Sequence, residues 1–206
     1  MKKDHQVILT GVLQFLFGGI LSVGAFLVCE CSACYPLSVE SWIEILQEAL
    51  LVLSTIFFSI AAVRSPQYGG GILLLAGLTF AFFIREMDGC LDLVFHGAWK
   101  YVLILCFPFY LYFQHKLGWR TIIPGIAHYI RSRSFMMFLP GSVIILVFSR
   151  LFGSKYLWLL YLPANVCIKK IKNFRSLSEE SIELLGYAII FGASLIAAYA
   201  TKKKKE

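Results

Sequence analysis

The sequence has few charged residues for its length. Only 15% of its 206 residues are Asp, Glu, Lys or Arg, whereas 59% are hydrophobic. The mean hydropathy of +0.76 is far above that of a typical soluble domain. The sequence also lacks a Walker loop, a Gly-x-Ser-x-Gly elbow and a His-Glu-x-x-His pair, so nucleotide hydrolysis, serine-esterase chemistry and zinc-protease chemistry have no support.

Long apolar runs dominate the chain instead. A hydrocarbon layer roughly 30 Å thick needs about 20 helical residues to cross it, and about six runs approach that length. They cover residues 7–28, 42–63, 70–84, 91–113, 135–152 and 183–200. No joint between the runs would hold a soluble domain. We therefore predict an all-α polytopic transmembrane helix bundle that forms a single integral-membrane domain over residues 1–206.

Two segments need a decision before the spans are counted. The first run follows Lys2 and Lys3 as a signal peptide would, but it is long and lacks a small-x-small cleavage site, so we count it as a span. The apolar part of residues 155–170 is too short to cross comfortably and contains Pro163. We expect that segment to be interfacial or re-entrant.

Charge gives the expected orientation. With six spans and both termini cytoplasmic, 11 of the 19 Lys and Arg residues lie inside, as basic residues prefer. Ten of the 12 Asp and Glu residues then share the opposite face. We expect a bacterial inner (cytoplasmic) membrane protein whose carboxylates gather at one end of the bundle.

Three acidic groups follow the four-residue spacing that places side chains on one helical face. The stripes are Glu40, Glu44 and Glu48; Asp88, Asp92, His96 and Lys100; and Glu179, Glu183 and Tyr187. Acids at helix starts also serve as caps and complement the helix dipole. We favour this structural explanation for Glu40, Glu179 and Glu180, although Glu180 also stays a candidate for binding.

Span length predicts which polar residues are buried. The run 101–113 is only about 20 Å long as a helix, so the fourth span would have to include Lys100, His96 and Asp92. Buried ionisable residues in a membrane are expensive and often functional. The residues proposed for ligand or ion binding are Glu44, Glu48, Glu86, Asp88, Asp92, His96, Glu180 and Glu183, with Arg85 and Lys100 as charge partners. A static salt-bridge knot of Arg85, Glu86, Asp92 and Lys100 is the structural alternative.

Metal binding is a further hypothesis. Asp88, Asp92 and His96 would place two carboxylates and one imidazole on one helical face, which suits a divalent metal. Cys29, Cys31 and Cys34 form a poor zinc signature without a second cluster. With Cys90 and Cys167 they fall on the oxidising side, where bridges are allowed and their connectivity stays open.

The remaining signals concern partners. His115, Lys116, Arg120, Arg131 and Arg133 form an inner basic loop suited to anionic lipids. Trp99, Trp119 and Trp158 are typical of the interfacial belt of a lipid bilayer. We expect no nucleic-acid partner, and we leave open a homo-oligomer or a larger membrane complex.

Three short blocks are similar to patterns in uncharacterised bacterial multi-pass inner-membrane proteins. They are residues 40–48, residues 85–100 with Arg85, Glu86 and Asp88, and residues 179–187 with Glu179, Glu180 and Glu183. The resemblance implies a shared fold and no particular activity. The chain also loosely resembles alkaline ceramidase-like membrane hydrolases, but their paired His-x3-His is absent here.

Three functions remain open. The first is a membrane component that binds or transports a cation, a proton or a cationic substrate through Glu48, Asp92, His96 and Glu183. The second is an intramembrane metal-dependent lipid or envelope hydrolase that uses Asp88, Asp92 and His96 as ligands and a Glu as general base. The third is an accessory or assembly subunit whose acids are structural.

Overall fold

A computed structural model describes residues 42–161 and 168–203, which form helices and turns without a strand. The first predicted span, 7–28, and Cys29, Cys31, Cys34 and Cys167 lie outside these ranges. The longer helices are α2 (Trp42–Arg64), α3 (Gly69–Glu86), α5 (Ala98–Leu117), α7 (Arg133–Val143) and α10 (Ile168–Lys203). The shorter ones are α4 (Asp88–Leu91), α6 (Ile122–Ile130), α8 (Ser149–Phe152) and α9 (Lys155–Tyr161).

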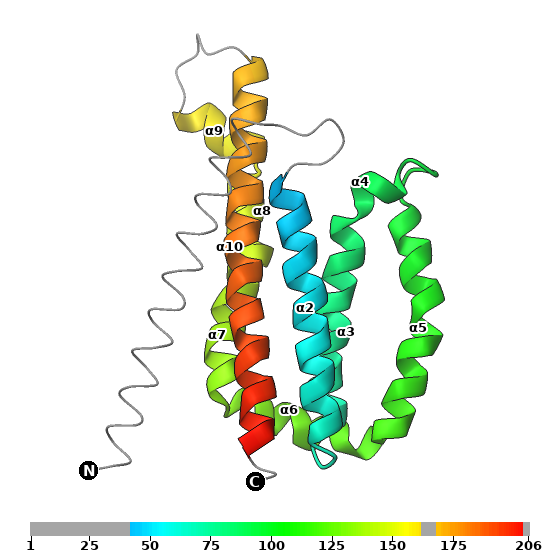
Figure 1. The fold of residues 1–206 in the computed structure, drawn as a ribbon. Helices are drawn as coiled ribbons and strands as arrows, with labels where there is room; N and C mark the ends of the chain where they lie inside the picture. Colours follow the sequence, from blue (N-terminus) through cyan, green and yellow to red (C-terminus); the bar gives the residue numbers. More distant parts are fainter. Residues whose placement is uncertain (1–41, 162–167, 204–206) are drawn as a thin grey trace, which may run out of the picture.

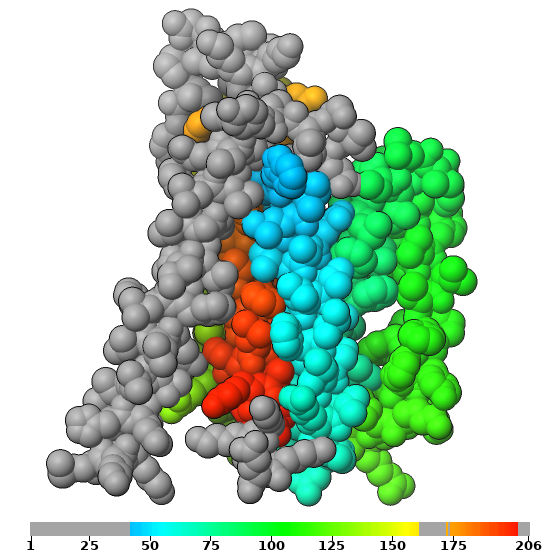
Figure 2. All heavy atoms as spheres, in the orientation of Figure 1, coloured from blue at the N-terminus to red at the C-terminus, as the bar shows by residue number. Residues whose placement is uncertain are grey.

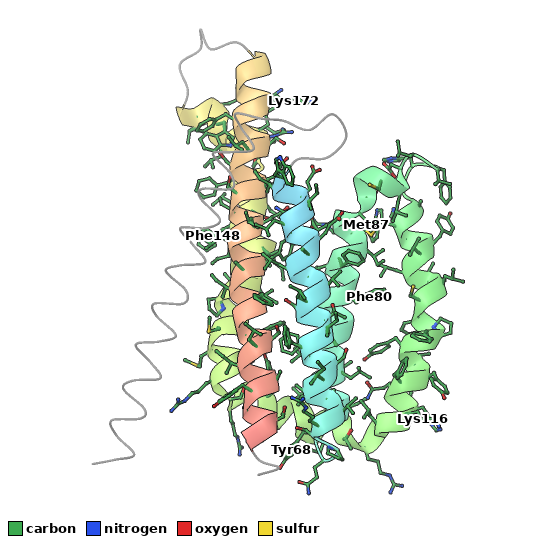
Figure 3. All side chains as sticks on the ribbon, in the orientation of Figure 1. Tyr68, Phe80, Met87, Lys116, Phe148 and Lys172 are labelled. Carbon is green, nitrogen blue, oxygen red and sulfur yellow. The ribbon has the colours of Figure 1, made fainter. Side chains whose placement is uncertain are left out.

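The long helices run up and down side by side (Figure 1). Helices α2, α5 and α10 descend in that view, whereas α3 and the continuous α7–α8 segment ascend. The start of α2, the α4 turn, α9 and the first half of α10 therefore lie at one end. The α2–α3 turn, α6 and the last turn of α10 lie at the other. Figure 3 marks the first end with Met87 and Lys172 and the second with Tyr68 and Lys116.

The apolar core lies where α2, α3, α7 and α10 meet. Phe58 of α2 is fully buried and packs edge-on against Tyr129 and Phe138, with ring centroids 6.1 and 5.9 Å away. Edge-to-face packing of this kind adds stability beyond the burial of area. These contacts join α2 to α6 and α7 near the lower half of Figure 1.

Glycine allows α6 to lie directly on the start of α3. A Cβ added at Gly125 would be 2.7 Å from Gly71 N, and closer still to the carbonyl oxygen of Tyr68. Both glycines are buried. The two backbones therefore approach more closely than any larger residue at position 125 would allow.

Four of the described helical segments are long and apolar enough to cross a membrane: Trp42–Arg64, Gly69–Glu86, Arg133–Phe152 and Phe174–Thr201. They correspond to the predicted spans 42–63, 70–84, 135–152 and 183–200. The all-helical, membrane-type fold is confirmed to this extent, whereas six spans are not confirmed. The 155–170 segment contains the seven-residue helix α9. Trp158 of α9 attaches this helix to the end of α8, because its Nε1 donates to Phe152 O at 2.6 Å.

The predicted fourth span begins in the wrong place. We expected one helix from about Asp88 through Lys100, but α4 ends at Leu91 and α5 begins only at Ala98. Gly97, with a φ of 81°, adopts the left-handed conformation immediately before α5 begins, a conformation that glycine adopts at little cost. The space-filling view shows α5 standing apart from the other helices over part of its length (Figure 2), and only Ala98 and Gln114 are buried in it.

Candidate functional site

Every acidic residue within the described ranges belongs to the end of the bundle that holds α4 and α9. The eight residues are Glu44, Glu48, Glu86, Asp88, Asp92, Glu179, Glu180 and Glu183. The helices that carry these residues contact one another directly. For example, Gln47 Nε2 of α2 donates to Glu180 O of α10 at 2.8 Å. The predicted gathering of these carboxylates at one end follows from the alternating helix directions. We call this region the acidic end.

Glu183 is the most deeply buried of these carboxylates. Its side chain is only 7% exposed, and its Oε1 accepts from three donors on other helices. They are Ser149 Oγ at 3.1 Å, Arg150 Nη2 at 3.2 Å and Arg85 Nη2 at 3.4 Å. Two guanidinium groups and one hydroxyl therefore compensate a charge that would otherwise be very costly in the bundle interior.

Glu86 and Glu183 both lie close to Nη2 of Arg85. Tyr187 is fully buried, and its hydroxyl donates to Glu86 Oε1 at 2.7 Å. Arg85 Nη2 is 3.7 Å from the same oxygen, a longer ion-pair distance than its 3.4 Å to Glu183. One guanidinium is thus shared between two carboxylates, and the hydroxyl of Tyr187 provides the shorter contact to Glu86.

Arg150 extends the network to the surface. Its Nη1 donates to Glu179 Oε1 at 2.9 Å while Nη2 reaches Glu183, and its side chain is 49% exposed. The two carboxylates are one helical turn apart on α10, so a single planar guanidinium can contact both. We define the Glu183 cluster as Arg85, Glu86, Ser149, Arg150, Glu179, Glu183 and Tyr187.

A π-helical turn precedes the residues that α8 contributes. Ile144–Phe148 forms this turn within the α7–α8 segment, immediately before Ser149 and Arg150. An inserted residue of this kind changes which side chains share a face, and such turns are frequent at functional sites. Gly186 allows the close approach of α10, because a Cβ there would collide with Ile145.

Asp88, Asp92, His96 and Lys100, the second predicted stripe, do not share one helical face. Asp92 follows α4, and His96 lies in the turn before α5 with a 96% exposed side chain. Asp92 Oδ2 is 2.8 Å from His96 Nδ1, and its Oδ1 accepts from the Gly97 backbone N–H at 2.7 Å. The burial expected for His96 is therefore wrong. Lys100 is exposed, with its ammonium 5.6 Å from the Trp99 ring centre.

The two aspartates of this turn have opposite electrostatic surroundings. The Gly97 N–H, with further help from His96, lowers the pKa of Asp92. Burial, followed by the charge of Asp92, raises the pKa of Asp88, and Asp88 Oδ1 is buried without a hydrogen-bond partner among the described residues. Within residues 42–161 and 168–203, no three His, Cys, Asp or Glu side chains are grouped to hold a metal.

The structural knot proposed from the sequence has different members. Arg85 and Glu86 belong to it, but Asp92 and Lys100 do not, and Glu183, Arg150 and Glu179 take their place. Glu44 and Glu48 are half-buried on α2, and Glu180 Oε1 accepts from Ser176 Oγ at 2.9 Å. The sequence analysis did not predict that Ser149 and Arg150 belong to this site. The available signal was Arg150 itself, a charged residue two positions before the end of the predicted span 135–152.

In the described part of the chain, fold and site together define a helical bundle with four membrane-capable helices and a buried cluster of acidic and basic side chains between them. Neither a protein family, a curated protein nor a solved structure was found to match the chain.

Proposed function

We propose that the chain is a multi-pass membrane protein that binds a proton within the Glu183 cluster and transports it across the membrane. The supporting observation is the charge of the cluster. Among the residues that the structure describes, three carboxylates, Glu86, Glu179 and Glu183, form ion pairs with two guanidinium groups, those of Arg85 and Arg150. One excess negative charge between apolar helices favours the uptake of one cation.

A proton is the cation that suits this geometry. A divalent metal requires several oxygen ligands directed at one point, whereas the carboxylate oxygens here already accept from Ser149, Tyr187 and the two arginines. A proton needs only one oxygen. Glu86 is the preferred acceptor, because its ion pair with Arg85 is the longest in the cluster at 3.7 Å.

Arg85 links the protonation of one carboxylate to the pairing of the other. When Glu86 carries the proton, Arg85 is attracted to Glu183 alone; when Glu86 is ionised, both carboxylates compete for the same guanidinium. The positions of Arg85 and of α3 relative to α10 would therefore respond to the proton. Such a two-position element is what coupling between a binding site and a helix movement requires.

The membrane and its sidedness belong to the same proposal. Exposed apolar side chains along the spans, such as Leu53, Ile56, Leu146 and Val147, would face acyl chains. The end opposite the acidic end carries Arg64, Lys116, Arg120, Arg131 and Arg133 and no acidic residue among those described. We call it the basic end. The preference of basic residues for the cytoplasm would orient it inward in a bacterial inner membrane.

Proton flux into liposomes tests the transport function. Purified protein is reconstituted into vesicles that contain a pH-sensitive dye, and a pH step is applied. Glu86→Gln and Glu183→Gln should each abolish protein-dependent flux. Asp92→Asn, a carboxylate of the same end outside the cluster, should leave flux unchanged. Flux that is absent from the wild type, or that survives both cluster variants, would rule out proton transport through these residues.

An accessory or assembly role is the second candidate, and one observation favours it. Glu183 has three donors from three different residues on two helical segments, so the cluster also fixes α3, α8 and α10 together. If the cluster is only structural, Glu86→Gln and Glu183→Gln would lower stability while cellular function persists wherever the protein still folds.

A further inference from the structure

An apolar groove opens between α3, α6 and α7, away from the Glu183 cluster. Its volume is about 280 Å³. Nine residues line it: Gly71, Leu74, Leu75, Leu78, Ile126, Tyr129, Ile130, Phe135 and Phe138. Tyr129 has the only polar side chain among them, and its hydroxyl pairs with buried Ser134 at 2.8 Å. The walls that remain are hydrocarbon.

The walls of the groove are closely packed. The Gly71–Gly125 approach holds α6 against α3, and the Tyr68 and His128 rings stack with centroids 4.1 Å apart. On the other side, Phe135 and Phe138 pack on Tyr129 at 6.0 Å. Leu78 and Ile130 are 41% and 50% exposed, so the groove is open to whatever surrounds the bundle.

Two arginines lie where the groove meets the basic end. Arg131 and Arg133 fall in sequence between the lining residues Ile130 and Phe135, and both are exposed. No salt bridge joins either arginine to a described carboxylate, and all eight of those carboxylates belong to the opposite end of the bundle. A hydrocarbon groove thus ends at two positive charges that no carboxylate among the described residues pairs with.

We propose that this groove is a binding site for one anionic phospholipid. An acyl chain fills the space between Leu78 and Phe138, and the phosphate headgroup lies at Arg131 and Arg133. A ligand with one long apolar part and one negative end matches both features, and basic pockets at the cytoplasmic ends of helices bind such headgroups. A second copy of the chain would match the apolar walls, but its described basic end would repel these arginines. The site does not depend on the proposed proton function.

Native mass spectrometry of the delipidated full chain tests the site. The probes are phosphatidylglycerol and phosphatidylcholine with identical acyl chains. The wild type should bind one phosphatidylglycerol in preference to phosphatidylcholine. Arg131→Gln combined with Arg133→Gln should weaken phosphatidylglycerol binding roughly 25-fold, because each basic residue near an anionic lipid contributes roughly a factor of five. Phosphatidylcholine binding should change little.

Two further variants separate the groove from general charge. Arg64→Gln combined with Lys116→Gln removes two bases from the same end and should leave the preference intact. Leu78→Ser combined with Ile130→Ser should weaken both lipids equally, because it alters the walls and not the arginines. All six substituted residues are exposed, so the fold should survive, which circular dichroism checks. Equal binding of both lipids by the wild type, equal losses in the two charge variants, or a lipid-free dimer would overturn the proposal.

Discussion

Replacing Glu183 by Gln should destabilise the bundle far more than replacing Glu86 by Gln. Loss of one partner from a buried ion pair costs about 3–5 kcal/mol. Arg150 is 49% exposed and keeps Glu179 at 2.9 Å, and Arg85 keeps Glu86 at 3.7 Å. The cost for Glu183→Gln should therefore lie at the low end of that range, about 3 kcal/mol.

Glu86→Gln provides the matched comparison. If Glu86 already carries the excess proton, a neutral amide replaces a neutral carboxyl and still accepts from the Tyr187 hydroxyl. The change in unfolding free energy should then stay below about 1 kcal/mol, the scale of one adjusted hydrogen bond. Both values can be measured by titration of the protein with a denaturing detergent in mixed micelles. Equal costs for the two variants, or a cost below about 1 kcal/mol for Glu183→Gln, would refute the assignment of charge within the cluster.

Two other predictions address the helix contact at Gly125 and the turn at Asp92. Gly125→Ala should lower the unfolding free energy by about 1–3 kcal/mol, as overpacking does, because the new methyl group meets backbone atoms of Gly71 and Tyr68. Gly89→Ala, where nothing lies within 4 Å, should be neutral in the same titration. Similar losses for the two variants would reject the close contact. The pKa of Asp92 is lowered in the folded chain, so its stabilisation of the turn is present above the ordinary Asp pKa of about 3.9 and is lost as the pH falls through the lower folded value. Hydrogen exchange at the Gly97 amide, normalised for the pH dependence of the chemical rate, should therefore show less protection at acid pH in the wild type and none of this change in Asp92→Asn.

The broad features of the fold were predictable because they depend on hydrophobic length. The predicted spans 42–63, 70–84, 135–152 and 183–200 coincide with helices, because a helix satisfies the backbone hydrogen bonds of a long apolar segment within the segment itself. The gathering of carboxylates at one end followed from the positions of acids at helix starts and ends. Span length predicted that Glu183 lies inside the bundle, and the structure buries it.

The errors have local causes. Four-residue spacing predicts a common face only while the helix continues, and here α4 ends at Leu91, so Asp92 and His96 lie in the turn before α5. The contribution of Arg150 was not predicted, because the side of the helix on which Arg150 lies depends on the π turn at Ile144–Phe148. A 3.6-residue period does not represent such a turn. Gly97, directly after His96, is a signal in the sequence for a break in the helix, whereas no residue in the sequence predicts the π turn.

The protonation state of Glu86 can be measured by infrared spectroscopy. For the protein in lipid vesicles at neutral pH, the method detects the carbonyl stretch of a protonated carboxyl group. We expect one such band in the wild type, its loss in Glu86→Gln and its persistence in Asp92→Asn. A wild type without the band, or a band that Glu86→Gln leaves unchanged, would show that Glu86 does not carry the proton.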